Sequence, residues 1–447
     1  MGNDLDQYPP GSPAKARIMT VRSWRLIILL FLTAEASYLC RVNISVVGAL
    51  MMHDLGFSQI DLGRLFSAFL LGYALFQIPA GGASDRWGAR RVLGWAALWW
   101  VVATGLISLL GWRFLGGTAT SALAVLCVLR FVLGVGEAPT FPAAAQGVAR
   151  WIPPARRGLA NGIVMSAVGA GSAIAPLLLS HVMVHWGWRV ALRVSAFPAL
   201  AVALAWMLSP SLGDVLPRPA WDQTTLPPRN SFWSSGERTQ TGPVGTKSIL
   251  WSPSFMLLTL SYTLEGYVGY IFVFWFYLYL VQVRHFDLLR AGRLGSIPWL
   301  LSMVSIPLGG VISDYLVVGP LGPCWGRRAV PVAGLAFSGI FLALGARTGN
   351  ANFAVVYLAL ATASVLSSEG PFWATMVDLA GPHSGTAGGV MNFGSNVGGV
   401  ISPVLTPIMA AYMGWQNALY VGAAVALLSA GLWLGVSPHV FDRIRTE

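Results

Sequence analysis

The stretch GYALFQIPAGGASDRWGARR, Gly72–Arg91, decides the fold of this chain. It begins in a run that is apolar enough to lie in a bilayer and ends in a short basic segment, DRWGARR. Glycines near a helix end let a neighbouring helix approach closely. Asp85 can then pair with an arginine or meet a helix N-terminus across an interface. The alternative is a plain loop that is basic only to fix its side of the membrane.

Composition indicates that most of the chain lies in a lipid bilayer. Of the 447 residues, 55% are hydrophobic and 10% are charged, whereas about a quarter of a soluble domain is charged. A membrane-spanning helix needs roughly 20 mainly apolar residues. A large soluble helical protein is disfavoured, because these stretches lack polar faces. The sequence therefore predicts an all-α membrane protein with twelve transmembrane helices, at 24–51, 60–83, 92–111, 119–149, 157–184, 189–210, 252–282, 291–316, 329–347, 351–378, 384–413 and 415–437.

The net charge of +11 suggests an acidic partner such as nucleic acid, but its distribution argues otherwise. With the N-terminus placed inside, most of the Lys and Arg residues fall in cytoplasmic segments, as in multi-pass membrane proteins. We expect both termini in the cytoplasm, no nucleic-acid partner and a location in the inner membrane of a bacterium. The stretch Arg284–Arg293 is an exception, since it carries three arginines on the outer side. Asp378 is expected near the outer vestibule.

An internal repeat divides the chain into two halves. Gly81–Arg91 has a partner in GGVISDYL…WGRR, Gly309–Arg328, and Gly162–Pro176 resembles Gly389–Pro403. EAP at Glu137 and EGP at Glu369 form a third pair at nearly the same offset, which argues for an ancient duplication. Two parallel six-helix repeats predict a rocking-bundle transporter with its site between the halves. The predicted organisation is a cytoplasmic tail (1–23), a six-helix bundle (24–210), a linker (211–250), a second bundle (251–437) and a tail (438–447).

With these motifs, the chain resembles the major facilitator superfamily over almost its whole length. RVNISV in the first span and RFVLGVGEAPTFPAAAQGVARWIPPARRGLANG further resemble the anion:cation symporter family, which includes bacterial sugar-acid transporters and animal sialic-acid and vesicular glutamate carriers. The resemblance implies a cytoplasmic latch that holds the outward-open state. The residues expected to form it are Asp85, Arg86, Arg90 and Arg91, with Asp314 and Arg327 as a looser copy.

Arg41 lies near the middle of the first span. A charge at the bilayer centre costs about 2.5–3.5 kcal/mol on insertion scales, so this side chain should face a cavity or a partner. Its planar guanidinium suits a carboxylate. It pairs either with an internal acid or with a substrate anion, and the family resemblance favours the substrate. Tyr38, one turn before it, adds a hydrogen-bonding group on that face.

Glu137 is the candidate for proton coupling, in agreement with the family resemblance. Arg130 lies seven residues before it, about 20° away around the helix, and is expected to be its partner. A fixed structural Arg–Glu bridge is the alternative. Relatives often carry Asp just before the first-span arginine, where this chain has Cys40, so a second proton site is in doubt. Glu35 is a further candidate, although it lies about 120° from Arg41 around the helix.

In the second half, aromatic and amide side chains predict the rest of a binding cavity. Phenol, indole and amide groups can bind hydroxyl groups of a substrate, whereas packing, interfacial anchoring or helix–helix bonding are the alternatives. The candidates are Tyr270, Trp275, Tyr279, Trp373, Asn392 and Asn396.

Together these features predict proton-coupled uptake of a small organic anion, such as a sugar acid, by alternating access. The expected partners are the anion, protons and the lipid bilayer, and the chain is expected to act as a monomer. No enzyme activity, metal site or cofactor is expected, because no nucleophile–base set or metal-ligand spacing is visible; the proton gradient is the energy source. Two rivals remain, namely an exporter of drugs or amphiphilic metabolites in the same fold and a non-transporting membrane sensor.

Overall fold

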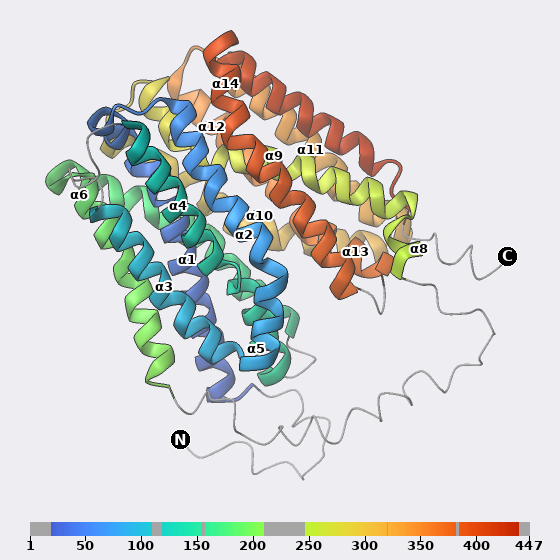
Figure 1. The fold of residues 1–447 in the computed structure, drawn as a ribbon. Helices are drawn as coiled ribbons and strands as arrows, with labels where there is room; N and C mark the ends of the chain where they lie inside the picture. The colour runs from blue at the N-terminus through green and yellow to red at the C-terminus, as the bar shows by residue number, and fades with distance from the viewer. Residues whose placement is uncertain are drawn as a thin grey trace, which may run out of the picture.

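The computed structural model describes residues 19–109, 119–152, 157–209, 246–319, 321–380 and 384–437, which are helical except at turns and short connections. The first half contains α1 (Val21–Leu55), α2 (Gln59–Trp87), α3 (Ala89–Leu109), α4 (Ala119–Glu137), α5 (Thr140–Trp151) and α6 (Arg157–Met207). The second half contains α8 (Thr246–Leu250), α9 (Pro253–Gln282), α10 (Leu288–Val318), α11 (Gly322–Arg347), α12 (Ala351–Leu366), α13 (Glu369–Ala380) and α14 (Ser384–Trp433). Figure 1 shows the halves side by side, blue to green and yellow to red.

Ten helical stretches of the described chain are long and apolar enough to span a membrane. Two of them, α6 and α14, each contain two spans joined at a glycine, Gly187 and Gly414, with φ of 81° and 83°. Only glycine adopts such backbone angles without strain, so the chain reverses there at little cost. The twelve predicted spans are thereby confirmed, and the chain is a multi-pass membrane protein. Most of the predicted tails and of the linker lie outside the described residues.

Two predicted spans are interrupted rather than continuous. The span predicted at 119–149 breaks after Glu137, and the one at 351–378 breaks before Glu369. A proline follows each glutamate by two residues, Pro139 and Pro371, and proline has no N–H to continue the helix ladder. The duplicated EAP and EGP motifs therefore place one carboxyl group of each half at a break inside the bundle.

The halves meet mainly where α2 packs against α14 (Figure 1) and α6 packs against α10, and α1 also contacts α9. We call the end of the bundle near Met207 and Thr246 the linker end, and the opposite end the distal end. Glycine permits the close contact: a Cβ on Gly63 would meet the Pro403 carbonyl oxygen. Nearby, Ser67 Oγ donates to the Val400 carbonyl at 2.6 Å.

Hydrogen bonds between the halves run from the distal end to just past the middle of the bundle. Gln59 bonds to Gln282 at the distal end, and Ser296 Oγ donates to the Ala173 carbonyl at 2.6 Å. Among the described residues, the hydrogen bond between the halves that lies nearest the linker end is donated by Asn392 to Gln77. The predicted latch lies beyond that point.

Arg90 and Arg327 of the predicted latch bond within their own halves. Arg90 donates to the carbonyls of Trp206 and Met207, Arg86 is exposed, and Arg91 also makes a contact. Arg327 bridges Asp314 at 2.5 Å and Asp378 at 2.8 Å. The Asp85 side chain lies outside the described residues. Asp378 was expected near the outer vestibule; that prediction is wrong, because α13 runs toward the linker end and ends at Ala380.

Candidate functional site

A buried ion pair forms the centre of the site. Arg41 of α1 and Glu137 at the end of α4 are 1% and 0% exposed. The Nε and Nη2 groups of Arg41 donate to the same Glu137 oxygen, Oε2, at 3.2 and 3.1 Å. Ser37 Oγ, one turn before Arg41, donates to that oxygen at 3.0 Å. Because the cation of one helix meets the anion of another, neither charge is left alone in the apolar core.

The two oxygens of the Glu137 carboxyl group have different surroundings. Oε2 accepts three hydrogen bonds, whereas Oε1 is buried and has no partner among the described residues. Buried polar atoms nearly always have a partner, so Oε1 is open to a water molecule, a proton or a ligand. Oε1 is the atom of this site that can receive a proton without breaking an existing bond.

Two tyrosines hold the Arg41 guanidinium between them. Its Cζ atom lies 4.5 Å from the ring centres of both Tyr38 and Tyr73, and its Nη1 donates to the Tyr38 hydroxyl at 3.3 Å. Cation–π contacts of this kind stabilise a desolvated cation. Tyr38 was predicted here, whereas Tyr73 on α2 was missed. The signal available in the sequence was a tyrosine hydroxyl in an otherwise apolar stretch of the second span.

Arg130 was predicted to be the modulating partner of Glu137; no direct ion pair joins the two among the described residues, and the modulating role stays a prediction. Seven residues separate them by about 10 Å along the helix axis. Arg130 instead donates to the backbone carbonyls of Cys40 and Arg41, at 3.5 and 3.1 Å, and its Cζ lies 4.6 Å from the centre of the Phe69 ring. It therefore fixes the backbone of α1 where Arg41 is attached.

Glu35 is not part of this cluster. Its backbone carbonyl faces α6, where a Cβ on Gly171 would meet it. Its half-buried side chain has no ion pair or hydrogen bond to any side chain that the structure describes. The angular separation from Arg41 anticipated this placement, and a coupling role for Glu35 stays a prediction.

A polar chain connects the ion pair to the second half. Gln77 Nε2 donates to the Tyr73 hydroxyl at 3.2 Å, and Gln77 Oε1 accepts from Asn392 at 2.8 Å and from Asn396 at 3.4 Å. The two asparagines were predicted from their i, i+4 spacing between glycines. Gln77 was missed, although it lies one turn after Tyr73 in an apolar helix. Through Gln77 and Tyr73, these contacts link the amide groups of α14 to Arg41.

The four predicted aromatic residues divide into separate groups. Tyr270 stacks on Phe274 with ring centres 5.6 Å apart and is half-buried. Trp275 and Tyr279 pack around Trp415 at 5.6 and 6.0 Å, nearer the distal end. The structure therefore places these two in a distal aromatic cluster rather than beside Arg41.

The distal aromatic cluster also explains Arg284, one of the three arginines at 284–293. Arg284 Nε donates to the Tyr279 hydroxyl at 2.8 Å, and its other nitrogens donate to the carbonyls of Gly345 and Thr348. These carbonyls end α11, where a cation is favourable to the helix dipole. Arg284 thus stabilises the end of α11, a structural role that the positive-inside pattern does not predict.

Trp373, the fourth aromatic, lies with a second acid. Its ring centre is 6.4 Å from that of Tyr262, whose hydroxyl donates to Glu369 Oε2 at 2.9 Å. Glu265, one turn after Tyr262, is 2% exposed. No cation lies within 4 Å of either carboxyl group among the described residues. Within the same limits, no group of three or more metal-binding side chains is present.

Comparison with known proteins agrees with this architecture. A family model described as Major Facilitator Superfamily matches residues 29–317 and 315–446. The chain is 33% identical to a probable sulfoacetate transporter of Cupriavidus necator. The alignment spans 370 residues and covers 83% of each protein. It is 26% identical to a hexuronate transporter of Bacillus subtilis, over 94% of each.

Solved structures show the same fold. A bacterial homologue of the human lysosomal transporter Spinster, in an inward-facing and unoccupied conformation, superposes with a TM-score of 0.74 over 95% of this chain and 99% of that chain. The two sequences are 17% identical, so this similarity concerns the fold alone.

Proposed function

The chain belongs to the Major Facilitator Superfamily, and we propose that it takes up a small organic anion together with protons across the inner membrane of a bacterium. The observation that carries the proposal is the buried Arg41–Glu137 pair, in which one carboxylate oxygen accepts three hydrogen bonds and the other has no partner among the described residues. Relatives whose names specify sulfoacetate and hexuronate support a small anion as substrate.

In this proposal the substrate carboxylate and Glu137 compete for Arg41. While the site is empty, Glu137 neutralises the guanidinium. A proton at Oε1 removes the negative charge of Glu137, and Arg41 can then bind the substrate carboxylate through two parallel N–H···O bonds. Loss of the substrate on the other side returns Glu137 to Arg41 and releases the proton. The proton and the anion therefore bind together, which is the requirement for symport.

Movement of the halves would open this site first to one side of the membrane and then to the other. The contacts of α2 with α14 and of α6 with α10 are the surfaces that would part and re-form. Gln77 and its bonds to Asn392 and Asn396 connect the arginine site to the moving second half. The latch arginines at the linker end would then pair across the halves in the opposite state.

Transport by purified protein in proteoliposomes tests the coupling. Glu137→Gln cannot take up a proton, but its amide leaves the shape of the site unchanged. The variant should therefore still exchange labelled organic acid outside for unlabelled acid inside. It should lose accumulation driven by an imposed pH gradient. Full gradient-driven accumulation by Glu137→Gln would contradict the proposal.

A further inference from the structure

Two contacts between the halves repeat one another in sequence. Near its distal start, α2 contains GRLFS (63–67), and α10 contains GRLGS (292–296) at the same position. Each stretch faces a proline-containing stretch of the other half: VISP (400–403) of α14 faces the first, and AIAP (173–176) of α6 faces the second. We call each pair of facing stretches a clasp. Because all four stretches follow the internal repeat, the two clasps are copies of one contact.

The glycine of each clasp lies against a backbone carbonyl of the other half. A Cβ on Gly63 would meet the Pro403 carbonyl oxygen. A Cβ on Gly292 would lie 2.6 Å from the Pro176 carbonyl oxygen and would also meet Ser180 Oγ. A side chain larger than the hydrogen of glycine therefore fits neither contact while the clasp is closed.

The serine of each clasp makes the same hydrogen bond at the same length. Ser67 Oγ donates to the Val400 carbonyl at 2.6 Å. Ser296 Oγ donates to the Ala173 carbonyl, also at 2.6 Å, and can reach the Gly292 carbonyl of its own helix at the longer distance of 3.1 Å. In both clasps the acceptor lies three residues before the proline. The repeat has therefore placed one hydrogen bond between the halves in each clasp.

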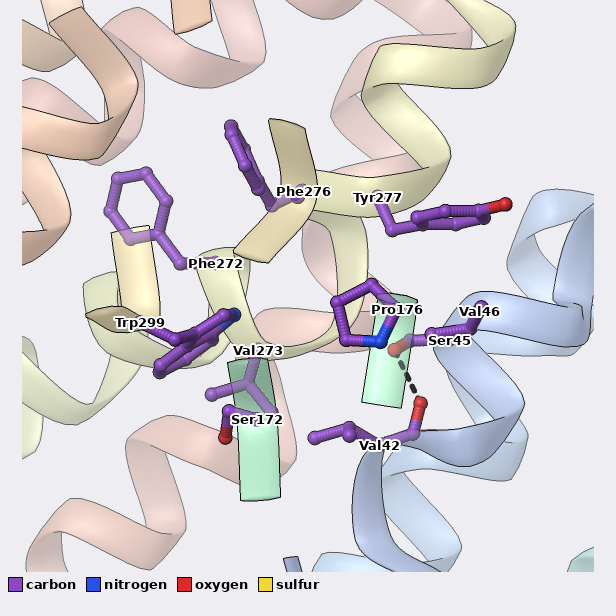
Figure 2. Close-up of a pocket in the computed structure, with 11 residues that line it drawn as sticks. Val42, Ser45, Val46, Ser172, Pro176, Phe272, Val273, Phe276, Tyr277 and Trp299 are labelled. Atoms are coloured by element: carbon purple, nitrogen blue, oxygen red, sulfur yellow. Dashed lines mark hydrogen bonds between the residues drawn. The ribbon is translucent and has the colours of Figure 1, made fainter. Parts of the chain in front are cut away.

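Side chains fill the interface around the clasps. Phe66 of the first clasp stacks on Phe274 of α9, with ring centres 4.4 Å apart. Beside Pro176 of the second clasp lies a hollow, and Figure 2 shows the side chains that line it. Its volume is about 10 Å³, enough for about one water molecule. A substrate larger than water therefore cannot pass beside this clasp while it is closed.

We propose that the two clasps form the distal gate of the carrier and that they open together, in one step. Two halves that rock as rigid bodies must part at both clasps, because each clasp joins the same two bodies. The end beyond the Asn392–Gln77 bond, where the described residues make no hydrogen bond between the halves, closes in the same movement. The inference rests on the alternating access of the proposed function, but not on the anion or on the proton.

Distances between spin labels on the purified full-length chain, measured by pulsed electron resonance, test the gate. Labels are attached at two cysteine pairs, each on exposed positions of the two helices that one clasp joins: Arg64→Cys with Tyr412→Cys, and Arg293→Cys with His185→Cys. The native Cys127 and Cys324 are changed to serine in every variant, so that they take no label, and Cys40 is buried. Each pair therefore reports the opening of its own clasp.

The glycine variants should have the largest effect. Gly63→Ala or Gly292→Ala should lengthen both label distances, because the added methyl group keeps one clasp apart and the rigid halves then hold the other open. Each half should fold normally, since the atoms that the methyl group would meet belong to the opposite half. Uptake should be lost. The matched controls are Gly82→Ala in α2 and Gly310→Ala in α10, where a Cβ would meet nothing within 4 Å, and both should keep the wild-type distances.

The serine variants test the same gate without adding volume. Ser67→Ala and Ser296→Ala should each raise the ratio of distal-open to distal-closed molecules by about two- to tenfold, the loss of one hydrogen bond, and by the same factor at both label pairs. The double variant should show the product of the two factors. The matched controls are Ser84→Ala in α2 and Ser302→Ala in α10, whose hydroxyls donate within their own helices. Both should behave like the wild type.

Two results would overturn the inference. Lengthening of only the label pair beside the substituted clasp would show that the clasps open separately. Wild-type distances in both glycine variants would show that the clasps do not hold the distal end. Either result leaves the anion proposal standing, because the labels report on the halves without substrate. Absence of organic-acid binding by the wild type would contradict the proposed function instead, and the label distances would still decide the gate.

Discussion

The two halves place an acid at the same point of the repeat but surround it differently. Glu137, at the break after α4, faces the cation of Arg41, whereas Glu369, at the break before α13, accepts from the neutral Tyr262 hydroxyl. Both halves have the proline break and the carboxyl group, and among the described residues only the carboxyl group of the first half pairs with a cation. In the proposed mechanism, the first half therefore carries the ionic chemistry, and the second half supplies uncharged groups such as Asn392.

Removing the cation of the first half should have the largest effect. Arg41→Ala leaves Glu137 buried without its partner and should lower the free energy of unfolding by about 3–5 kcal/mol. Uptake should fall by about 100-fold or more, because the anion loses its buried charged partner. Uptake assays and thermal unfolding of the purified protein measure both effects.

The double variant Arg41→Ala/Glu137→Gln is the control for this prediction. It removes both charges, so most of the lost stability should return while transport stays absent. Transport by either variant at the wild-type rate would show that the arginine does not bind substrate.

Arg130 should affect stability rather than coupling. Arg130→Gln removes bonds to two backbone carbonyls of α1 and should lower the free energy of unfolding by about 1–3 kcal/mol. The ratio of protons to anions carried should stay that of the wild type, as measured by reversal potentials in proteoliposomes. A changed ratio would restore Arg130 to the proton-coupling role that its spacing suggested.

The connection between the halves should have an intermediate effect. Gln77→Leu leaves the amide of Asn392 and the Tyr73 hydroxyl each without one bond, and uptake should fall by about tenfold. Asn392→Leu should give a similar loss, and the double variant should lose little more, since both remove the same contact. Additive losses would mean that the two residues act separately.

The acid of the second half should matter least. Glu369→Gln keeps an oxygen that accepts from Tyr262, so uptake should change by less than about threefold and accumulation should persist, unlike in Glu137→Gln. Paired uptake measurements on the two variants compare the halves directly. Loss of accumulation in Glu369→Gln would assign a coupling role to the second half as well.

The sequence was sufficient for the fold because apolar length, glycine, proline and a repeat are local signals. It was less informative about the site, because the site forms between helices. Helix periodicity put Arg130 and Glu137 on one face, yet Arg41 reaches Glu137 from another helix. Likewise, the sequence could not show that Trp275 packs against Trp415 in the distal aromatic cluster, because that contact joins α9 to α14.

The central claim is that Glu137 takes up a proton when the substrate replaces it at Arg41. Mixing the purified protein with a bound organic acid in weak buffer, with a pH-sensitive dye, measures this exchange directly. The account predicts that binding makes the medium more alkaline in the wild type, that affinity falls as pH rises, and that Glu137→Gln binds without proton uptake. Binding by the wild type with no proton uptake, or equal uptake by Glu137→Gln, would contradict it.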